Sequence, residues 1–174
     1  VPDTKRQAVE KALRSLVVAA EVDTPGYSRA QFGRPWADID HNGCDQRDDV
    51  LARDLTRVRR SGRCTVTSGV LADPYTGAAI RLTRATADQV HIDHIVALSS
   101  AWREGAADWS PGRREQYANS LANLLAVTAD ANLKKSDQDA ADWQPDGADR
   151  QCAYAHRVVA IKVKWGLTVD ENER

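Results

Sequence analysis

The chain has few cysteines, no methionine and no long apolar run, and each absence argues against a class of protein. Three cysteines occur among its 174 residues, none in Cys-x-x-Cys spacing, which argues against a structural zinc site. The longest apolar run, near Leu16–Ala20, is too short to cross a bilayer, so no membrane partner is expected. Because the chain starts at Val1 and lacks methionine, we expect a processed product whose signal peptide has been removed.

An excess of positive charge is also absent. The chain has 24 Lys and Arg against 25 Asp and Glu, which gives a net charge of −1. A protein that held nucleic acid by bulk electrostatics would be basic, so such a partner would have to be held by a few local groups. Hydrophobic residues make up 42% and charged residues 28%, as in a globular protein, and the length predicts a single domain, residues 1–174.

Hydrophobic spacing and turn residues predict an α+β arrangement. The expected elements, in chain order, are a helix over 4–22, a helix over 48–60, a hairpin of 66–71 and 79–83, a strand over 90–96, a helix opening at Ser110-Pro111, and a strand over 124–128. A last helix follows, bearing Asn132, Lys134 and Lys135, and either Thr128 or Asp130 can cap it. Strand, long connection, strand and helix thus follow one another in the second half.

A carboxylate beside an imidazole is the most informative feature of the chain. Asp93 and His94 lie in the apolar stretch Val90–Val96. A carboxylate is a hard oxygen ligand for a divalent cation, and an imidazole acts as a base near neutral pH. Two asparagines follow, Asn123 before the next strand and Asn132 on the element after it. The pair therefore brings together the two groups that a metal-assisted reaction needs.

This order of residues resembles the ββα-metal (HNH) endonucleases, and further blocks extend the resemblance from about Tyr27 to Val169. The blocks, in order, are Gly26-Tyr27-Ser28-Arg29, Gly43-Cys44-Asp45-Gln46-Arg47, Asp73-Pro74-Tyr75-Thr76-Gly77, Ala101-Trp102-Arg103-Glu104-Gly105-Ala106 and Lys164-Trp165-Gly166-Leu167-Thr168-Val169. They look like a secreted bacterial branch of these nucleases, related to the nuclease domain of GmrSD-type restriction enzymes. Ala97, Ser120 and Ser136 depart from the pattern, and none replaces a proposed catalytic group.

The resemblance implies an α+β fold with a ββα-metal core at about residues 88–140 and additional packing helices. It implies hydrolysis of DNA, possibly of RNA, with little sequence specificity, by a monomer that uses one divalent cation, Mg²⁺ or alternatively Mn²⁺. His94 would be the general base, and Asp93 and Asn132 would hold the metal. Asn123 would fix the loop between the strands, with Asn119 as a competitor for that role. Lys135 would act in catalysis by steadying the phosphate or the transition state, and the weaker candidates for phosphate contacts are Lys134, Arg114 and Arg47.

The cysteines agree with a secreted, extracellular protein. Cys44 and Cys64 could close a loop of about 20 residues, worth about 3 kcal/mol in the chain-entropy model, and we expect them to form a disulfide. Cys152 is then either a free buried thiol or a residue whose partner has been trimmed away.

Two other functions compete with a nuclease. His91-Ile92-Asp93-His94 resembles the end of a zinc-hydrolase motif, but Gln89 occupies the place of its first His, and only His41 and His156 could serve elsewhere. His91 itself is expected to pack locally. A secreted module that binds DNA or metal without turnover would keep Asp93 and Asn132, but it would not need His94.

Overall fold

The computed structural model describes residues 3–174, and side-chain surroundings for residue 7 and from residue 9 onward. It contains two small antiparallel sheets and several helices, so the predicted α+β class is confirmed. The elements are α1 (Asp3–Ser15), η1 (Arg29–Phe32), α2 (Gln46–Asp54), β1 (Leu55–Ser61), β2 (Thr65–Ala72), β3 (Ala79–Leu82), η2 (Arg84–Gln89), β4 (Val90–His94), α3 (Leu98–Arg103), η3 (Ala106–Asp108), α4 (Pro111–Ala118), β5 (Leu124–Thr128), α5 (Ala129–Lys135) and α6 (Ala148–Trp165).

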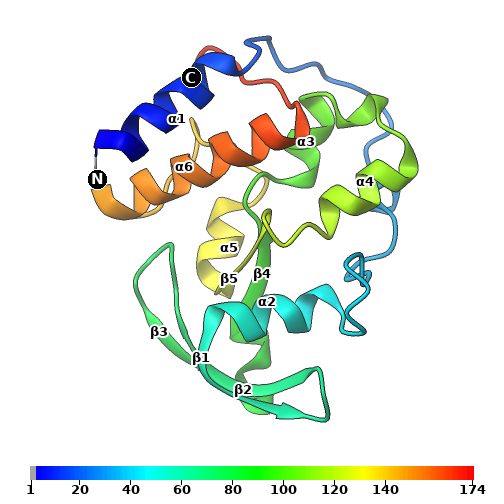
Figure 1. Ribbon diagram of the computed structural model, residues 1–174, viewed down its shortest axis with the longest axis vertical. Helices are drawn as coiled ribbons and strands as arrows, with labels where there is room; N and C mark the ends of the chain where they lie inside the picture. The colour runs from blue at the N-terminus through cyan, green and yellow to red at the C-terminus, as the bar shows by residue number, and fades with distance from the viewer. Residues whose placement is uncertain (1–2) are drawn as a thin grey trace.

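The β4–β5 pair lies in the middle of the molecule (Figure 1). Its register joins Val90 to Thr128 and His94 to Leu124. Every residue of β5 is buried, and alternate side chains face two different hydrophobic clusters. Because successive side chains of a strand point to opposite faces, a strand buried on both sides is largely apolar, as Leu-Leu-Ala-Val at 124–127 is.

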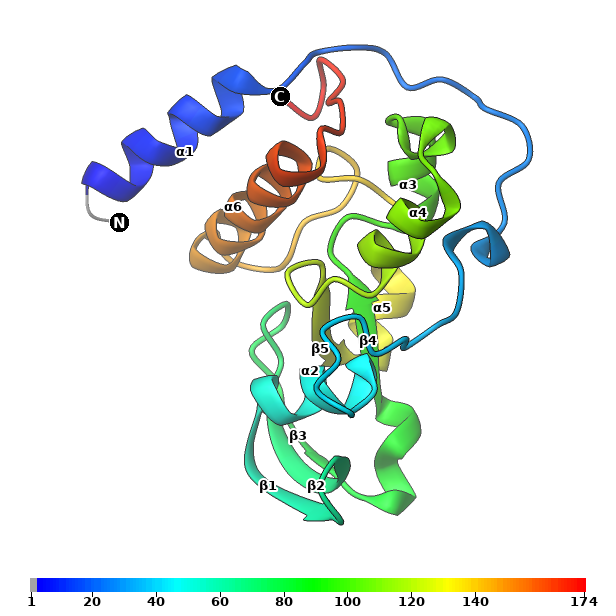
Figure 2. The same ribbon diagram turned by 45° about the vertical axis from the view of Figure 1, so that its right-hand side comes forward.

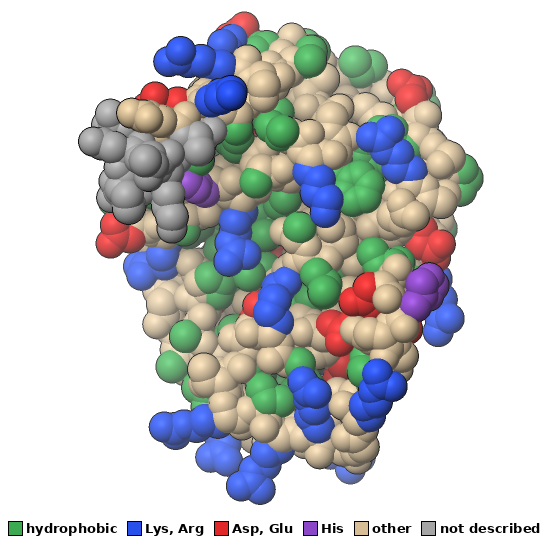
Figure 3. All heavy atoms as spheres, viewed as in Figure 1, with side chains coloured by type: hydrophobic (Ala, Val, Ile, Leu, Met, Phe, Trp, Pro, Cys, Tyr) green, Lys and Arg blue, Asp and Glu red, His purple; other side chains and the backbone are tan. Residues whose placement is uncertain are grey.

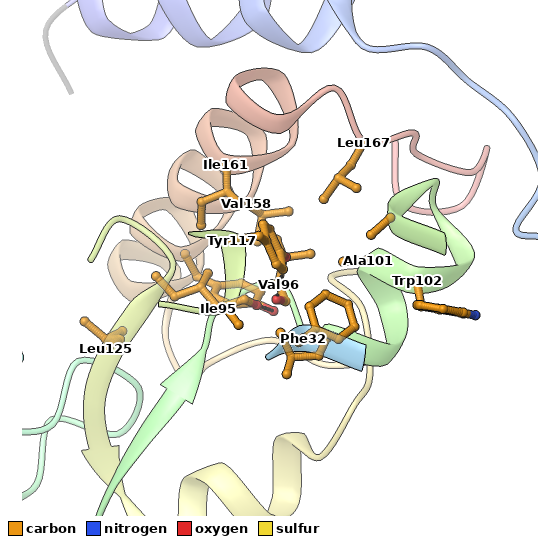
Figure 4. Close-up of a cluster of buried hydrophobic side chains, with 14 of the residues drawn as sticks. Phe32, Ile95, Val96, Ala101, Trp102, Tyr117, Leu125, Val158, Ile161 and Leu167 are labelled. Atoms are coloured by element: carbon orange, nitrogen blue, oxygen red, sulfur yellow. Dashed lines mark hydrogen bonds between the residues drawn. The ribbon is translucent and has the colours of Figure 1, made fainter. Parts of the chain in front are cut away.

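The larger cluster lies between the central pair and helices α3, α4 and α6 (Figure 4). Figure 2 shows these three helices above the central pair. Phe32 and Tyr117 lie at its centre with ring centroids 6.1 Å apart. The Tyr117 hydroxyl donates a 2.8 Å hydrogen bond to the Val96 carbonyl. This bond ties α4 to the segment that directly follows Asp93-His94.

The smaller cluster joins the central pair to α2 and to the sheet of order β1-β2-β3. Val50 and Leu51 of α2 are fully buried in it, and Leu124 and Ala126 of β5 form its other wall. Asp54, the last residue of α2, accepts a 2.9 Å hydrogen bond from the Ala126 amide. Strand β5 is therefore fixed from both faces.

The helix expected over 48–60 is shorter than predicted. Helix α2 ends at Asp54, and Leu55 begins β1, which pairs antiparallel with β2. Leu55 and Val58 fit helical spacing, but pairing with Leu71 and the neighbouring residues of β2 overrides that local preference.

Most other predicted elements are present. The hairpin is β2 and β3, Ser110 caps α4, and the Thr128 hydroxyl rather than Asp130 caps α5. The first helix stops at Ser15 instead of running to residue 22, and Val18 then bridges to Val169. The side chain of Thr4, with which that helix was predicted to begin, lies outside the described side chains. Helix α6 was not predicted, and no described helix is long and apolar enough to span a membrane.

Cys44 and Cys64 form a disulfide, as predicted, with their Cα atoms 5.3 Å apart. The bond ties the start of α2 to the start of β2. Cys152 is a free thiol, but it is exposed and not buried.

A buried lysine on α6 holds the C-terminal segment in place. The Nζ of Lys162 lies 3.0 Å from Glu104 Oε2 and also pairs with the Glu173 carboxylate. Burial raises the pKa of Glu173 to about 7, and the attraction of Lys162 opposes that rise. Two carboxylates therefore share one ammonium group.

This arrangement predicts a pH-dependent contribution to stability. A raised pKa means that the folded protein binds the Glu173 proton more tightly than the unfolded chain, whose reference value is 4.5. The resulting stability is fully present below that reference value and is lost as the pH rises through about 7. In thermal unfolding between pH 4.5 and 8, Glu173→Gln should lose this part of the pH dependence while keeping the Lys162–Glu104 pair. Parallel curves for the two proteins would contradict the assignment.

Candidate functional site

The turn between β2 and β3 places Tyr75 next to Asp93 of the central strand β4. Asp73 Oδ1 accepts a 2.9 Å hydrogen bond from the Tyr75 amide, and Asp73 Oδ2 accepts a 2.6 Å bond from the Thr128 hydroxyl. The turn is thus fastened to the residue that caps α5. The Tyr75 hydroxyl in turn donates a 2.7 Å hydrogen bond to Asp93 Oδ2.

Asp93 is a buried carboxylate whose two oxygens both have partners. Lys135 Nζ lies 3.1 Å from Asp93 Oδ1 and donates a 3.0 Å hydrogen bond to the His94 carbonyl. Lys135 is 0% exposed, so its ammonium group is enclosed with this carboxylate. Burial raises the pKa of the Asp93 carboxyl, and Lys135 and Tyr75 oppose that rise by stabilising the charged form. Lys135 therefore holds Asp93 and the β4 backbone from inside, and its role at a phosphate stays a prediction.

His94 is held in one tautomer at the end of β4. Its Nε2 lies 2.8 Å from the carbonyl oxygen of Ala118, and a carbonyl can only accept a hydrogen bond. Nε2 must therefore carry the proton, which leaves Nδ1 of the neutral ring as an acceptor. Burial lowers the pKa of His94 to about 4, so the ring is neutral at pH 7.

Asn123 fixes the backbone that follows His94. Its Oδ1 accepts a 2.9 Å hydrogen bond from the Val96 amide, and its Nδ2 donates a 3.1 Å bond to the Val96 carbonyl. The Asn123 carbonyl also accepts a 2.8 Å bond from the Ile95 amide. This geometry matches the organising role expected for Asn123. Asn119, the competitor, instead binds the segment Arg34–Ala37.

Asn132 contacts His91 of β4, whereas it was expected to act together with Asp93. Its Nδ2 is 3.2 Å from His91 Nδ1, and Asp93 is paired with Lys135. Residues 91 and 93 share one strand face, and residues 132 and 135 share one helix face, so two successive contacts join β4 to α5. His91 therefore contacts a residue of the candidate site, where local packing was expected for it.

Two pockets meet at His94. A polar pocket of about 300 Å³ is lined by Asp93, His94, Ser99, Asn132 and Asp137, among others. An apolar pocket of about 350 Å³ is lined mainly by Phe32, Pro35, Trp36, Leu98 and Ala118. Arg29, His94 and Leu98 line both pockets, so they form the boundary between them.

The other predicted phosphate contacts lie elsewhere. Arg114 is buried and donates to the carbonyls of Gln31 and Trp109, which makes it a structural residue. Lys134 is exposed and pairs with Asp130 at 2.9 Å. Arg47 lies in the first turn of α2 and lines neither pocket.

Sequence reasoning missed four residues of the site: Arg29, Tyr75, Ser99 and Asp137. Arg29 and Tyr75 each belong to one of the sequence blocks that carry the family resemblance, and this was the signal that could have identified them as site residues. Ser99 donates a 3.1 Å hydrogen bond to Asp137, a contact across the fold that local sequence does not reveal.

Removing the Lys135 ammonium should strongly destabilise the fold. Lys135→Met leaves the Asp93 charge buried without its cation, which typically costs about 3–5 kcal/mol. Lys134→Met is the matched control on the same helix, because its ion pair is exposed and should change stability by less than about 0.5 kcal/mol. Denaturant unfolding measures both, and equal small losses would show that the buried pair is not important for stability.

Comparison with known proteins gives two findings on location. A protein of Arthroderma benhamiae, named an uncharacterized secreted protein, is 38% identical over 167 residues, which cover 95% of this chain and 79% of that protein. Together with the Cys44–Cys64 disulfide, it confirms the extracellular location predicted from the sequence. No solved structure matches the chain.

The competing zinc hydrolase would need a group of at least three His, Cys, Asp or Glu side chains placed to bind a metal ion, and the described residues hold no such group.

The family comparison bears on the predicted nuclease relationship. The HNH assignment and the bacterial branch remain predictions. The family described as GmrSD restriction endonucleases, C-terminal domain, matches residues 45–174, and the chain belongs to that family.

Proposed function

We propose that this protein is a metal-dependent endonuclease that hydrolyses phosphodiester bonds in DNA, with RNA as an alternative substrate, and with little sequence specificity. In this proposal β4, β5 and α5 form the ββα-metal core of an HNH nuclease. The single observation that supports it most is the fixed His94 ring, neutral and with Nδ1 left as acceptor, at the edge of a polar pocket that Asp93 and Asn132 also line.

His94 is the general base of this proposal. A water molecule in the polar pocket would give its proton to Nδ1 while it attacks phosphorus. The Ala118 carbonyl holds the Nε2 proton and so stabilises the imidazolium that forms. Asn123 keeps the backbone after His94 in place, and the ring orientation does not depend on the substrate.

The donor groups of the pocket fit a hard divalent cation such as Mg²⁺, with Mn²⁺ as an alternative. Asp93 accepts two hydrogen bonds, which leaves part of its lone-pair capacity available. Asn132 supplies a neutral amide oxygen, and Asp137 lines the same pocket. Mg²⁺ usually keeps several waters and takes one or two carboxylates, which agrees with this small set. Such a cation would neutralise charge on the phosphate and on the leaving oxygen.

Arg29 is a further proposed phosphate contact beside Lys135. It is exposed, lies between the polar and the apolar pocket, and carries a charge complementary to the substrate. Figure 3 shows Lys and Arg side chains scattered over one face of the molecule without a continuous patch. With a net charge of −1, the protein would hold nucleic acid through a few local contacts and should tolerate salt well.

The proposal predicts cleavage that requires a divalent cation. Plasmid, linear duplex and RNA would each be incubated with Mg²⁺, Mn²⁺, Ca²⁺, Zn²⁺ or EDTA and separated on gels. We expect plasmid to be cut with Mg²⁺ or Mn²⁺ and to stay intact with EDTA. Binding without cleavage under every cation would favour the non-catalytic DNA- or metal-binding module instead.

Two substitutions should impair the reaction in different ways. His94→Ala removes the base and should lower turnover by roughly 10²–10⁴-fold at any metal concentration. Asn132→Ala removes a proposed ligand, so excess Mg²⁺ should restore part of its rate. His156→Ala on α6, at a residue that lines neither pocket, is the control and should cleave normally. Near-normal cleavage by folded His94→Ala would overturn the assignment of the base.

A further inference from the structure

The loop before α2 has the residue pattern of a calcium-binding loop. Asp38-x-Asp40-x-Asn42-Gly43 is followed, after five intervening residues, by Asp49. The EF-hand pattern is Asp-x-Asp/Asn-x-Asp/Asn-Gly-x₅-Glu, so the match differs only in having Asp as the last ligand. From this pattern and the contacts below, we propose that residues 38–49 form a calcium site, separate from the candidate active site.

Each ligand position of such a loop holds a suitable oxygen. The EF-hand uses positions 1, 3, 5, 7, 9 and 12, the seventh through its backbone carbonyl, and needs glycine at position 6 for a sharp turn. Here those ligands are Asp38, Asp40, Asn42, the Cys44 carbonyl, Gln46 and Asp49. Gly43 stands at position 6 with φ +86°, a conformation that strains other residues. The helix that normally follows the loop is present as α2.

The side chains of this pattern form one connected network. The Asp38 carboxylate accepts hydrogen bonds from the amides of Asn42 and Gly43, at 3.1 and 2.8 Å. The Asn42 Nδ2 lies between two carboxylates, 3.2 Å from Asp40 and 2.8 Å from Asp49. Figure 3 shows acidic side chains gathered at the right of the view, where this loop lies.

A buried amide oxygen independently indicates a missing ligand. Gln46 is 0% exposed, and its Nε2 lies 3.4 Å from Asp40 Oδ1, which puts the amide group at the network. Its Oε1 is buried without a hydrogen-bond partner, which normally costs free energy. Gln46 occupies position 9, whose side chain faces the cation directly or through a water. A calcium ion in the loop would supply the partner that Oε1 lacks.

Binding requires a local rearrangement. Within residues 3–174, no three acidic, His or Cys side chains already converge as a metal site. A cation would displace the Asn42 amide nitrogen from between Asp40 and Asp49, and that amide would turn its oxygen inward. The loop has only three carboxylates, and the last of them is Asp in place of Glu, which suggests the affinity of extracellular modules, a Kd of about 10⁻⁴–10⁻³ M. The loop starts two residues after Trp36, which lines the apolar pocket.

The test is calorimetric titration of the EDTA-treated protein, disulfide intact, with CaCl₂. The wild type should bind one Ca²⁺ in the loop, and about tenfold excess over Kd should raise Tm by roughly 3–5 °C. Asp49→Asn should weaken this binding at least tenfold. Asp88→Asn, at an exposed aspartate in η2, is the charge-matched control and should bind normally. Circular dichroism checks that each variant is folded, and Asp38→Asn replaces Asp49→Asn if the latter fails to fold.

A further variant separates this site from the proposed catalytic cation. Asn132→Ala should keep the loop's calcium binding and its Tm increase. Loss of all Ca²⁺ binding in Asn132→Ala, unchanged binding in Asp49→Asn, or no binding by the wild type at 10 mM, roughly tenfold above the weakest expected Kd, would each overturn the proposal. None of these readouts requires the protein to be a nuclease.

Discussion

The buried contact between Asp93 and Lys135 is the constraint on which the site depends. A charged pair without water contact is stable only if its remaining hydrogen-bonding groups are satisfied. Tyr75 supplies a donor to Asp93, and the His94 carbonyl accepts from Lys135. The pair therefore joins three parts of the chain: the β2–β3 turn, the end of β4 and the last turn of α5. Each of these parts presents a residue near the polar pocket.

The two hydrophobic clusters turn this local constraint into a rigid site. Strand β5 is buried on both faces, so β4, which pairs with it along five residues, cannot shift its register without exposing one cluster. His94 is then held from the side by the Ala118 carbonyl of α4, while Asn123 fixes the next two residues. The imidazole orientation is thus set by packing and backbone contacts, and substrate is not needed to establish it.

The sequence was most informative where a residue's role depends on its immediate neighbours. The strands at β4 and β5, the turn at residues 73–77 and the Ser110 cap of α4 followed from local patterns, whereas the α5 cap was left open between Thr128 and Asp130. The cysteine pair followed from its separation together with the family resemblance. The partners of Asp93 and Asn132 did not. Choosing Lys135 and His91 required the register of a helix on a strand, which depends on tertiary packing. The helix predicted over residues 48–60 was wrong for a related reason, since pairing with β2 decided the structure of Leu55–Ser61.

The central claim is that His94 is a neutral base with its proton on Nε2. Heteronuclear NMR of the imidazole nitrogens, assigned by comparison with His94→Gln, reports protonation and tautomer directly. At pH 7 the account predicts that Nε2 carries a proton and Nδ1 does not, and that this state persists down to about pH 5, because burial lowers the pKa of His94 to about 4. An imidazolium at pH 7, or a neutral ring protonated on Nδ1, would contradict the account.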